Sequence, residues 1–565
     1  MEDRNAIKEY IKTRLDQMKS IRMRGDDRRI TCCAMLNHRL DDLHSPVSRK
    51  SLKGSVAIDA IQTTIRGMAG YMISPSIRWF RYQTKGRNFQ DSDLLYGAND
   101  WLELVENLEY AIFSNSRFYS NSLMALADAL IIGTSYEMVT DDVQDGRIIY
   151  DCYSPFECYI AEDGQRRVNT WFREYNLTAD EAYSKWGEEC PADVKDLVTK
   201  GSGATECTFI HAIFPRKKAE IADVAIPAAQ NKRFASVHWC SNGDEVFKIS
   251  GYDEFPLAVH RYRLVDGTPY GASLASDNLE AIIESDLLHA KYDKALAKQV
   301  DPPVVVPESM RGRYTQNPGD ILYGNLQNGG PVALQTSLDL KGLAQRMVEV
   351  DAMLNRLMFA DLFNVLMRQE RQRTAYEVQE LKGEGLVLLS AIIGNMQEEK
   401  LNPVVLRTFS IMLKNRMLPQ PPDELRDAWT EGRVRIELDG PLAQTMKQYH
   451  QTTGYMQGLA WVTSVANVFP EELVNIDGGE LMRGGATSQG LSQKAIREKS
   501  DVDKIKRQQA ENQAKAQQQQ EALVQSQVAK NLGVNAQQMA QAQAQSGTTA
   551  QQMMQNGMAP GMGGF

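Results

Sequence analysis

The sequence has 565 residues, of which 42% are hydrophobic and 24% are charged. This composition excludes a chain that is disordered throughout, and the length favours several sub-domains over one compact core. The formal net charge is -9, so no basic surface covers the whole protein, and any contact with nucleic acid must be local or weak.

The N-terminal part is predicted to be mainly helical. Charged and apolar residues alternate at helical spacing over residues 1–45, and apolar residues recur near a 3.6-residue period over 55–73. Residues 100–131 predict two helices that separate near Asn115.

Strands are predicted from Thr134 onward, where the apolar pattern shortens. The first two, SYEMVTDD and RIIYDCY, are joined by Asp145-Gly146, a dipeptide typical of hairpin turns. Further strand patterns are ECTFIHAIFP, SVHWC and EVFKISG, with Asn242-Gly243 as another turn signal. Helices and strands together predict a mixed α+β domain.

Two long helices with a small β-rich module between them are predicted next. Residues 268–300 carry a helical pattern that should stop before Pro302, because the residue before a proline disfavours the helical conformation. Short strand patterns separated by Gly and Pro follow over 301–336. A second helix over 337–366 has its apolar residues on one stripe.

A third long helix is predicted to open with the capping box of Thr374 and Glu377 and to be kinked or split at Pro403. Beyond it, RVRIEL is predicted to be a strand that returns to an earlier sheet, and residues 440–475 are predicted to be helical. From about residue 500 the chain is rich in Gln, Ala and Met, which predicts a helix followed by a disordered tail.

The common enzyme motifs are missing, and we assign no catalytic residue, metal ligand or cofactor. The chain has no Gly-Lys dipeptide, which excludes the phosphate-binding loop GxxxxGK[ST] of many ATPases, and no His-Glu dipeptide, which excludes the HExxH zinc motif. Acidic neighbours such as Glu398-Glu399 are interpreted as solvated surface. The adjacent pair Cys32-Cys33 lacks the spacing of a zinc or redox site, so reduced structural thiols are expected.

Several runs together resemble the head-to-tail connecting protein family, the portal proteins of short-tailed bacteriophages. They cover most of residues 55–500 in the order of the family, which makes the resemblance more specific than any single motif. In chain order the runs are SPSIRWFRYQ, FYSNSLMALADALIIGTSYEMVTDD, SPFECYIAEDGQRRVNTWFREYNLTADEA, TPYGASLASDNLEAI, DPPVVVP, RTAYEVQELKGEGLVLL, LNPVVLRTFSIMLKNRMLPQPPDEL and GPLAQTMKQ. Residues 1–54 and the Gln-rich end match less well.

The resemblance implies a multi-domain α+β portal fold that assembles as a ring, typically of twelve subunits, around a central channel. The expected parts are N-terminal helices with a mixed wing (1–267), a first stem helix (268–300), a β-rich clip (301–336), a second stem helix (337–366), a tunnel loop (367–376), a kinked wing helix with a return strand (377–439), a helical crown (440–500) and a tail (501–565).

The implied function is a conduit for packaging and ejection of double-stranded DNA and an attachment point for the tail. Expected partners are further copies of the chain, DNA, the terminase packaging motor, the major capsid and scaffolding proteins, tail adaptors and internal ejection proteins. The expected location is a capsid vertex of the virion. Because the sequence has neither a signal peptide nor a stretch of the ~18 apolar residues that span a membrane, assembly is expected in the host cytoplasm.

The Gln/Ala-rich end also leaves open a protein of another class, an internal core protein that enters the host envelope during infection. Closed rings with a central hole would distinguish a portal from such a protein.

Two groups of cationic residues are candidates for contact with DNA. Lys291, Lys294 and Lys298 lie at i, i+3 and i+7 and form one basic stripe, either facing the channel or forming a solvated outer face. By contrast, Trp79, Phe80 and Tyr82 are predicted to pack in a core rather than to stack on bases.

The second group is Arg368, Arg371 and Arg373, which the resemblance places in the tunnel loop that narrows the channel. A guanidinium group can bind a phosphate through two hydrogen bonds, so a ring of these arginines can hold DNA through many weak, sequence-independent contacts. The alternative is that Glu370 and neighbouring acids pair with the arginines in a network between subunits.

Overall fold

The computed structural model describes most of the chain before residue 440. The described residues are 4–40, 46–48, 50, 52–84, 96–142, 146–217, 231–300, 302, 304–305, 332–333, 339–367, 389–423, 425, 434–440, 460–464, 482 and separate helical residues between 502 and 541. The chain divides into two units, Met1–Tyr449 and His450–Phe565. The elements that follow belong to the first unit.

A five-stranded antiparallel sheet forms one part of this unit, in the order β4-β5-β6-β7-β8. The strands are β4 (Cys158–Glu162), β5 (Val168–Thr178), β6 (Glu206–Pro215), β7 (Phe234–Cys240) and β8 (Glu245–Tyr252). The last three confirm the predicted strand patterns. β4 and β5 were not predicted.

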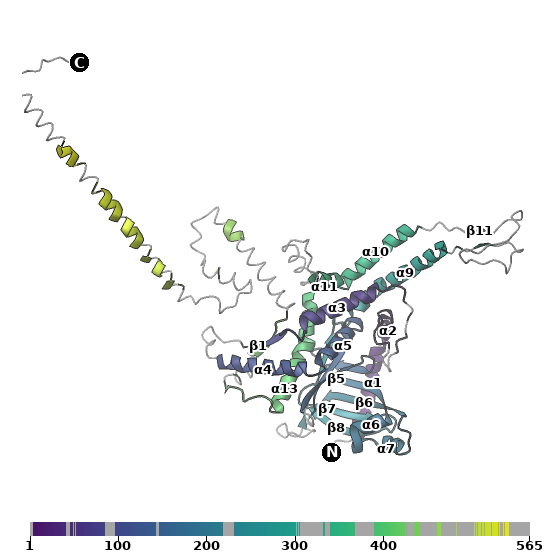
Figure 1. The fold of residues 1–565 in the computed structure, drawn as a ribbon. Coiled ribbons are helices and arrows are strands. Elements are labelled where there is room, and N and C mark those ends of the chain that lie inside the picture. The colour runs from purple at the N-terminus through teal and green to yellow at the C-terminus, as the bar shows by residue number, and fades with distance from the viewer. Residues whose placement is uncertain are drawn as a thin grey trace, which may run out of the picture. The chain divides into compact units, whose positions relative to one another are not determined.

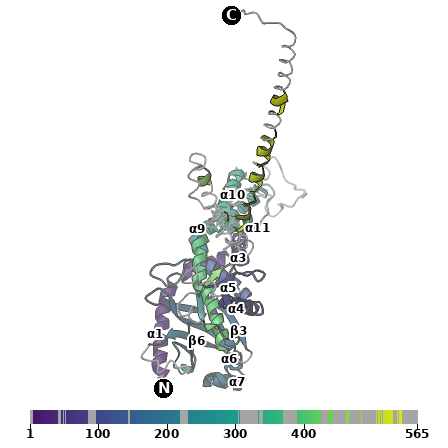
Figure 2. The ribbon, with the colours of Figure 1, turned by 90° about the vertical axis from the view of Figure 1, so that its left-hand side faces the viewer.

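Successive side chains of each strand point to opposite faces of this sheet, and apolar side chains lie on both faces. Helices cover both faces. The helix α1 (Arg4–Met23) packs Ile11, Leu15 and Met18 against one face and crosses the strands, with contacts to both edge strands, β4 and β8 (Figure 2). On the other face, α6 (Ala179–Trp186) and α7 (Ala192–Thr199) pack against a cluster that includes Phe209 and Cys207.

A three-stranded sheet in the order β3-β2-β9 lies next to this layer, and its strands are β2 (Thr134–Asp142), β3 (Arg147–Tyr153) and β9 (Leu257–Arg261). β2 and β3 are antiparallel, which confirms the predicted hairpin. Tyr136 and Met138 of β2 share a core cluster with Trp171 of β5, so the two sheets are packed together.

The largest core lies among helices: α2 (Asp26–Met35), α3 (Val56–Met72), α4 (Tyr96–Ser114) and α5 (Phe118–Ile131). The predicted separation of the last two near Asn115 is confirmed. Strand β12 (Val434–Leu438) pairs antiparallel with β1 (Phe80–Thr84), which confirms that RVRIEL returns to an earlier strand.

A helical hairpin extends from this core and ends in a short β-ladder (Figure 1). Its elements are α8 (Leu274–Asp277), α9 (Leu279–Val300), β10 (Val304–Val305), β11 (Val332–Ala333), α10 (Leu340–Leu357) and α11 (Ala360–Met367). β10 and β11 pair antiparallel. The described part of 301–336 therefore contains a strand pair, and the rest of that module lies outside the described residues.

The two hairpin helices are shorter than predicted. A capping box of Ser273 and Ser276 opens α8, which ends at Asp277, so the continuous helix expected over 268–300 is wrong before Leu279. The helix expected over 337–366 is broken between α10 and α11, where Phe359 has a φ of 60°. A left-handed residue cannot continue a right-handed helix.

Pro403 neither stops the third helix nor separates it into two. Residues 389–396 are helical, a π-helix follows over Gln397–Leu401, and α13 (Asn402–Lys414) begins directly after it with the proline in its first turn. The backbone N–H of Asn402 bonds the carbonyl of Gln397, five residues earlier. The irregularity that the proline predicts thus takes the form of a π-turn.

Candidate functional site

Side chains of α9 and α10 hold the hairpin together. Ser285 Oγ donates to Asp351 Oδ1 at 2.7 Å, and His289 Nε2 lies 3.4 Å from Asp351 Oδ2. In a further contact between the two helices, Arg346 of α10 donates to Glu284 of α9 at 3.0 Å. After Ser285, Ala295 is the one buried residue of α9. Polar contacts rather than apolar packing therefore fix how the two helices lie side by side.

The base of α9 is anchored in the helical core. Leu279 and Ile282 are buried there, and Asp286 Oδ1 accepts hydrogen bonds from the backbone N–H groups of Lys53 (2.6 Å) and Gly54 (3.1 Å). The last five residues of the helix, 296–300, are all exposed in the described part of the chain. Only the base of α9 is thus packed into a core of this chain.

The three lysines of the predicted stripe are exposed on α9. His289 contacts Asp351 of α10 and so marks the side of α9 that faces α10. At 100° per residue around the helix axis, the three lysines lie about 140–200° from His289. They are therefore on the side of α9 turned away from α10. Within the described part of the chain, Lys291, Lys294 and Lys298 make no ion pair. The three lysines thus lie together on one exposed side of α9.

Apolar side chains continue the same face toward the base of the hairpin. Ile283 and Leu287 are 39% and 49% exposed and precede Lys291 at four-residue steps. We call the set of Ile283, Leu287, Lys291, Lys294 and Lys298 the outer face of α9. Its apolar half can bind another protein surface and its cationic half can bind phosphate.

The three arginines of the second group, Arg368, Arg371 and Arg373, lie outside the described residues. The chain on both sides of them is described and well packed. Before them, α11 buries Phe363 in the helical core. After them, the helix over 389–396 buries Leu389, Ile393 and Met396 in the same core.

The π-helix carries two ion pairs that the sequence did not predict, one buried and one partly buried. Glu399 bonds the side chain of Arg261 on β9, and Lys400 bonds Glu137 on β2. The interpretation of Glu398-Glu399 as solvated surface is therefore wrong for Glu399. No local signal could reveal these pairs, because their members lie 138 and 263 residues apart.

Another buried carboxylate, Asp128 of α5, is bound by Arg39 and His38 at 2.7 and 2.8 Å. Burial alone would raise its pKa, but the nearby Arg39 guanidinium and the hydrogen bonds hold the pKa of this carboxyl below its usual value. These buried charges join separate elements and have the character of structural ion pairs.

The aromatic segment packs as predicted. Trp79 and Phe80 are fully buried, and the Trp79 ring is stacked on Phe118 at a centroid distance of 5.9 Å. Tyr82 is also buried and donates its hydroxyl to Glu109 at 3.1 Å. These rings form a core and are not available for stacking on bases.

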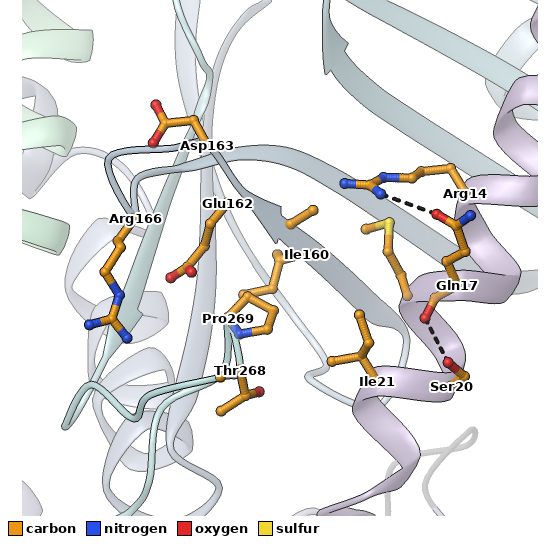
Figure 3. Close-up of a pocket in the computed structure, with 13 residues that line it drawn as sticks. Arg14, Gln17, Ser20, Ile21, Ile160, Glu162, Asp163, Arg166, Thr268 and Pro269 are labelled. Atoms are coloured by element: carbon orange, nitrogen blue, oxygen red, sulfur yellow. Dashed lines mark hydrogen bonds between the residues drawn. The ribbon is translucent and has the colours of Figure 1, made fainter.

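An open cavity of about 550 Å³ lies between α1, the end of β4 and the loop at Thr268 (Figure 3). Its carboxylates already have partners: Glu162 bonds Arg261, and Asp163 accepts the backbone N–H groups of Gln165 and Arg167 at 2.8 and 2.9 Å. Arg14 donates to Gln17 at 3.1 Å. The cavity brings no nucleophile and base together, so it has no catalytic arrangement.

The described residues provide neither a metal-ion site nor a membrane-spanning helix. No group of three or more His, Cys, Asp or Glu side chains is placed to hold a metal ion. None of the helices there combines the length and the apolar character that crossing a bilayer requires.

Comparisons with known proteins agree on one family. The model of the family described as "Bacteriophage head to tail connecting protein" matches residues 8–496. The chain is 29% identical over 468 residues to the probable portal protein of Bordetella phage BPP-1, which covers 81% of this chain and 82% of that protein. It is 27% identical over 531 residues to the portal protein of Salmonella phage epsilon15, covering 90% and 92% of the two chains.

Proposed function

Since the chain belongs to the bacteriophage head to tail connecting protein family and has a portal function in the phage head, we propose that copies of it close a ring whose channel conducts double-stranded DNA. The family assignment confirms the resemblance carried by the sequence runs. Family and relatives are named for a structural part of the virion head rather than for an enzyme, and the family implies association with capsid and tail in a ring.

The observation that carries the proposal is the outer face of α9. Exposed Ile283 and Leu287 need a partner surface, and three lysines beyond them have no acidic partner in the described part of the chain. In a ring of tilted hairpins the adjacent copy would cover the apolar half near the base of α9, and the cationic half further along the helix would face the channel. Closing a ring from one chain type requires such a surface on each subunit, complementary to a different surface on the next.

We assign the hairpin to the stem of the portal and the module over 301–336 to its clip. The β10–β11 pair at the end of the hairpin supports this, because a short ladder presents exposed backbone groups that can pair with another chain. The clip would bind the terminase motor during packaging and a tail adaptor afterwards. Residues 1–267 and 377–439 would form the wing, and 440–500 the crown.

The arginine-bearing segment is proposed as the tunnel loop. Arg368, Arg371 and Arg373 would contact the phosphates of the passing duplex, and the sequence-independent character of such contacts allows the DNA to slide. The acidic net charge of the chain suits transport, because tight binding with release of many counterions would stall it. By the same proposal the ring contains twelve copies of the chain and assembles in the host cytoplasm. Its further partners would be scaffolding and ejection proteins.

Charge-neutral substitution tests the channel role directly. Virions would be assembled with Lys291, Lys294 and Lys298 all changed to Gln, and separately with Arg368, Arg371 and Arg373 all changed to Gln. The proposal predicts normal rings with altered packaging, retention or ejection of DNA in both. Loss of rings in the arginine variant would instead favour the inter-subunit network, and normal DNA handling in both variants would contradict the channel role.

A further inference from the structure

The break between α10 and α11 is held by one helix of the core, α3. α11 ends at Met367, directly before Arg368, so the direction of α11 decides where the arginine-bearing segment begins. α10 and α11 both pack on α3. The relevant contacts are made by Thr64 and Gly67, which lie three residues apart and hence on one side of α3.

Thr64 supports the backbone at the break itself. Its side chain is fully buried, and its hydroxyl donates to the carbonyl of Met358, the last residue before Phe359. Phe359 has a φ of 60°, a conformation that a bulky residue keeps only where its surroundings impose it. Thr64 thus satisfies a carbonyl that the interrupted helix leaves without a helical partner.

Gly67 supplies the space for α11. A Cβ atom at this position would overlap the ring of Phe363 and would lie 2.9 Å from its Cβ, closer than side-chain carbons approach one another. Phe363 is fully buried and cannot turn away into solvent. Its ring also lies 6.4 Å from that of Tyr71, one helical turn further along α3.

We infer that Thr64 and Gly67 are positioning residues of the portal channel: they seat the α10–α11 break and Phe363 on α3, and so fix the point at which the chain enters the segment carrying Arg368, Arg371 and Arg373. This inference rests on the proposed function for its consequence. Its structural part rests on the described contacts alone.

The glycines of α3 provide a matched pair of variants. In Gly67→Ala the new methyl group displaces Phe363 and with it α11. In Gly70→Ala, on the same helix, the new methyl group meets no atom within 4 Å, so this variant is the control. Thr64→Val keeps the shape of the side chain and removes the hydrogen bond to Met358. Gly67→Ala combined with Phe363→Leu removes part of the clash and should restore the wild-type behaviour at least partly.

Two measurements are made on assembled rings and virions of each variant. The first is the rate of tryptic cleavage after the three arginines. The second is the fraction of particles that keep their DNA. We expect Gly67→Ala and Thr64→Val to change cleavage several-fold and to lower DNA retention, Gly70→Ala to match the wild type, and the double variant to return toward it. If Gly67→Ala does not assemble, Thr64→Val and the double variant carry the test.

The outcomes separate this inference from the proposed function. If Gly67→Ala and Thr64→Val match Gly70→Ala in both measurements while the triple arginine-to-glutamine variant loses DNA, the positioning role is overturned and the channel function stands. If the triple arginine variant retains and ejects DNA normally, the function proposed for the arginines fails, and the inference falls with it.

Discussion

Lys400 of the π-helix and Glu137 of β2 form an ion pair in which each side chain is only 1% exposed. Glu137 also accepts a hydrogen bond from Ser122 of α5 at 3.1 Å. Next to it, Arg261 of β9 binds Glu399. The helix that follows the arginine-bearing segment is therefore joined to the three-stranded sheet through two adjacent charged residues.

Replacing Lys400 by Met leaves the Glu137 carboxylate buried without its cation. We expect a loss of about 3–5 kcal/mol in the free energy of unfolding, because an uncompensated buried charge is costly. Urea titration followed by tryptophan fluorescence measures this. The double variant Lys400→Met with Glu137→Leu should recover most of the loss, and a single variant as stable as the wild type would show that the pair is not buried.

Glu109 is predicted to make stability fall with rising pH. Its carboxyl is fully buried on α4, and burial raises its pKa well above the usual value; the hydrogen bond from Tyr82 opposes this shift and the nearby acid Glu106 adds to it. A carboxyl with a raised folded-state pKa binds more protons when folded, so its destabilisation begins above the unfolded pKa of about 4.5 and grows until the folded pKa is passed.

Glu109→Gln removes this titration and keeps an acceptor for the Tyr82 hydroxyl. We expect its melting temperature to exceed that of the wild type at pH 8 and the difference to shrink at pH 4. Scanning calorimetry at both pH values is the measurement. A wild type that is as stable as the variant at pH 8 would mean that Glu109 has a cationic partner.

Buried histidines are expected to make the fold sensitive to acid. His260 is buried with no hydrogen-bond partner for either ring nitrogen among the described residues, and burial, together with the charges of Lys400 and Arg261, lowers its pKa to about 3. His211 and His238 are stacked with ring centroids 4.0 Å apart, and burial lowers the pKa of both. A lowered folded-state pKa means that stability is present above pH 6.5 and is lost as the pH falls toward 3.

His260→Leu should leave stability at pH 7.5 nearly unchanged, since it removes two nitrogens without hydrogen bonds. At pH 5 the variant should be more stable than the wild type. In the wild type His260 binds a proton at this pH only when the chain is unfolded, which favours unfolding, and leucine cannot bind one. Equal slopes of melting temperature against pH for both proteins would show that His260 does not contribute.

How much of this fold follows from sequence depends on how local each signal is. The β2–β3 hairpin was predicted because Asp145-Gly146 is a turn signal between two strand patterns, and the two helices around Asn115 were predicted from their period. The break at Phe359 was not predicted, because Thr64, nearly 300 residues earlier, supports it. The lysine stripe follows from spacing, whereas the role of the arginines rests on the resemblance to the family.

The apolar half of the outer face of α9 should govern association between copies. Leu287→Asp places a charge where an apolar contact is proposed, and we expect association to weaken by about tenfold or more while the single chain stays folded. Analytical ultracentrifugation gives the oligomer distribution and circular dichroism the folded state. Leu413→Asp on α13, where the leucine is 46% exposed, is the control. Unchanged association of Leu287→Asp would exclude this face from the interface.

Electron microscopy of the purified full chain tests the portal assignment most directly. We predict closed rings with a central hole wide enough for duplex DNA, with the α9–α10 hairpins side by side around it and Lys291, Lys294 and Lys298 turned toward the hole. Monomers or open filaments at every protein concentration would contradict ring closure, and closed rings with these lysines on the outer surface would contradict the assignment of α9 to the channel wall.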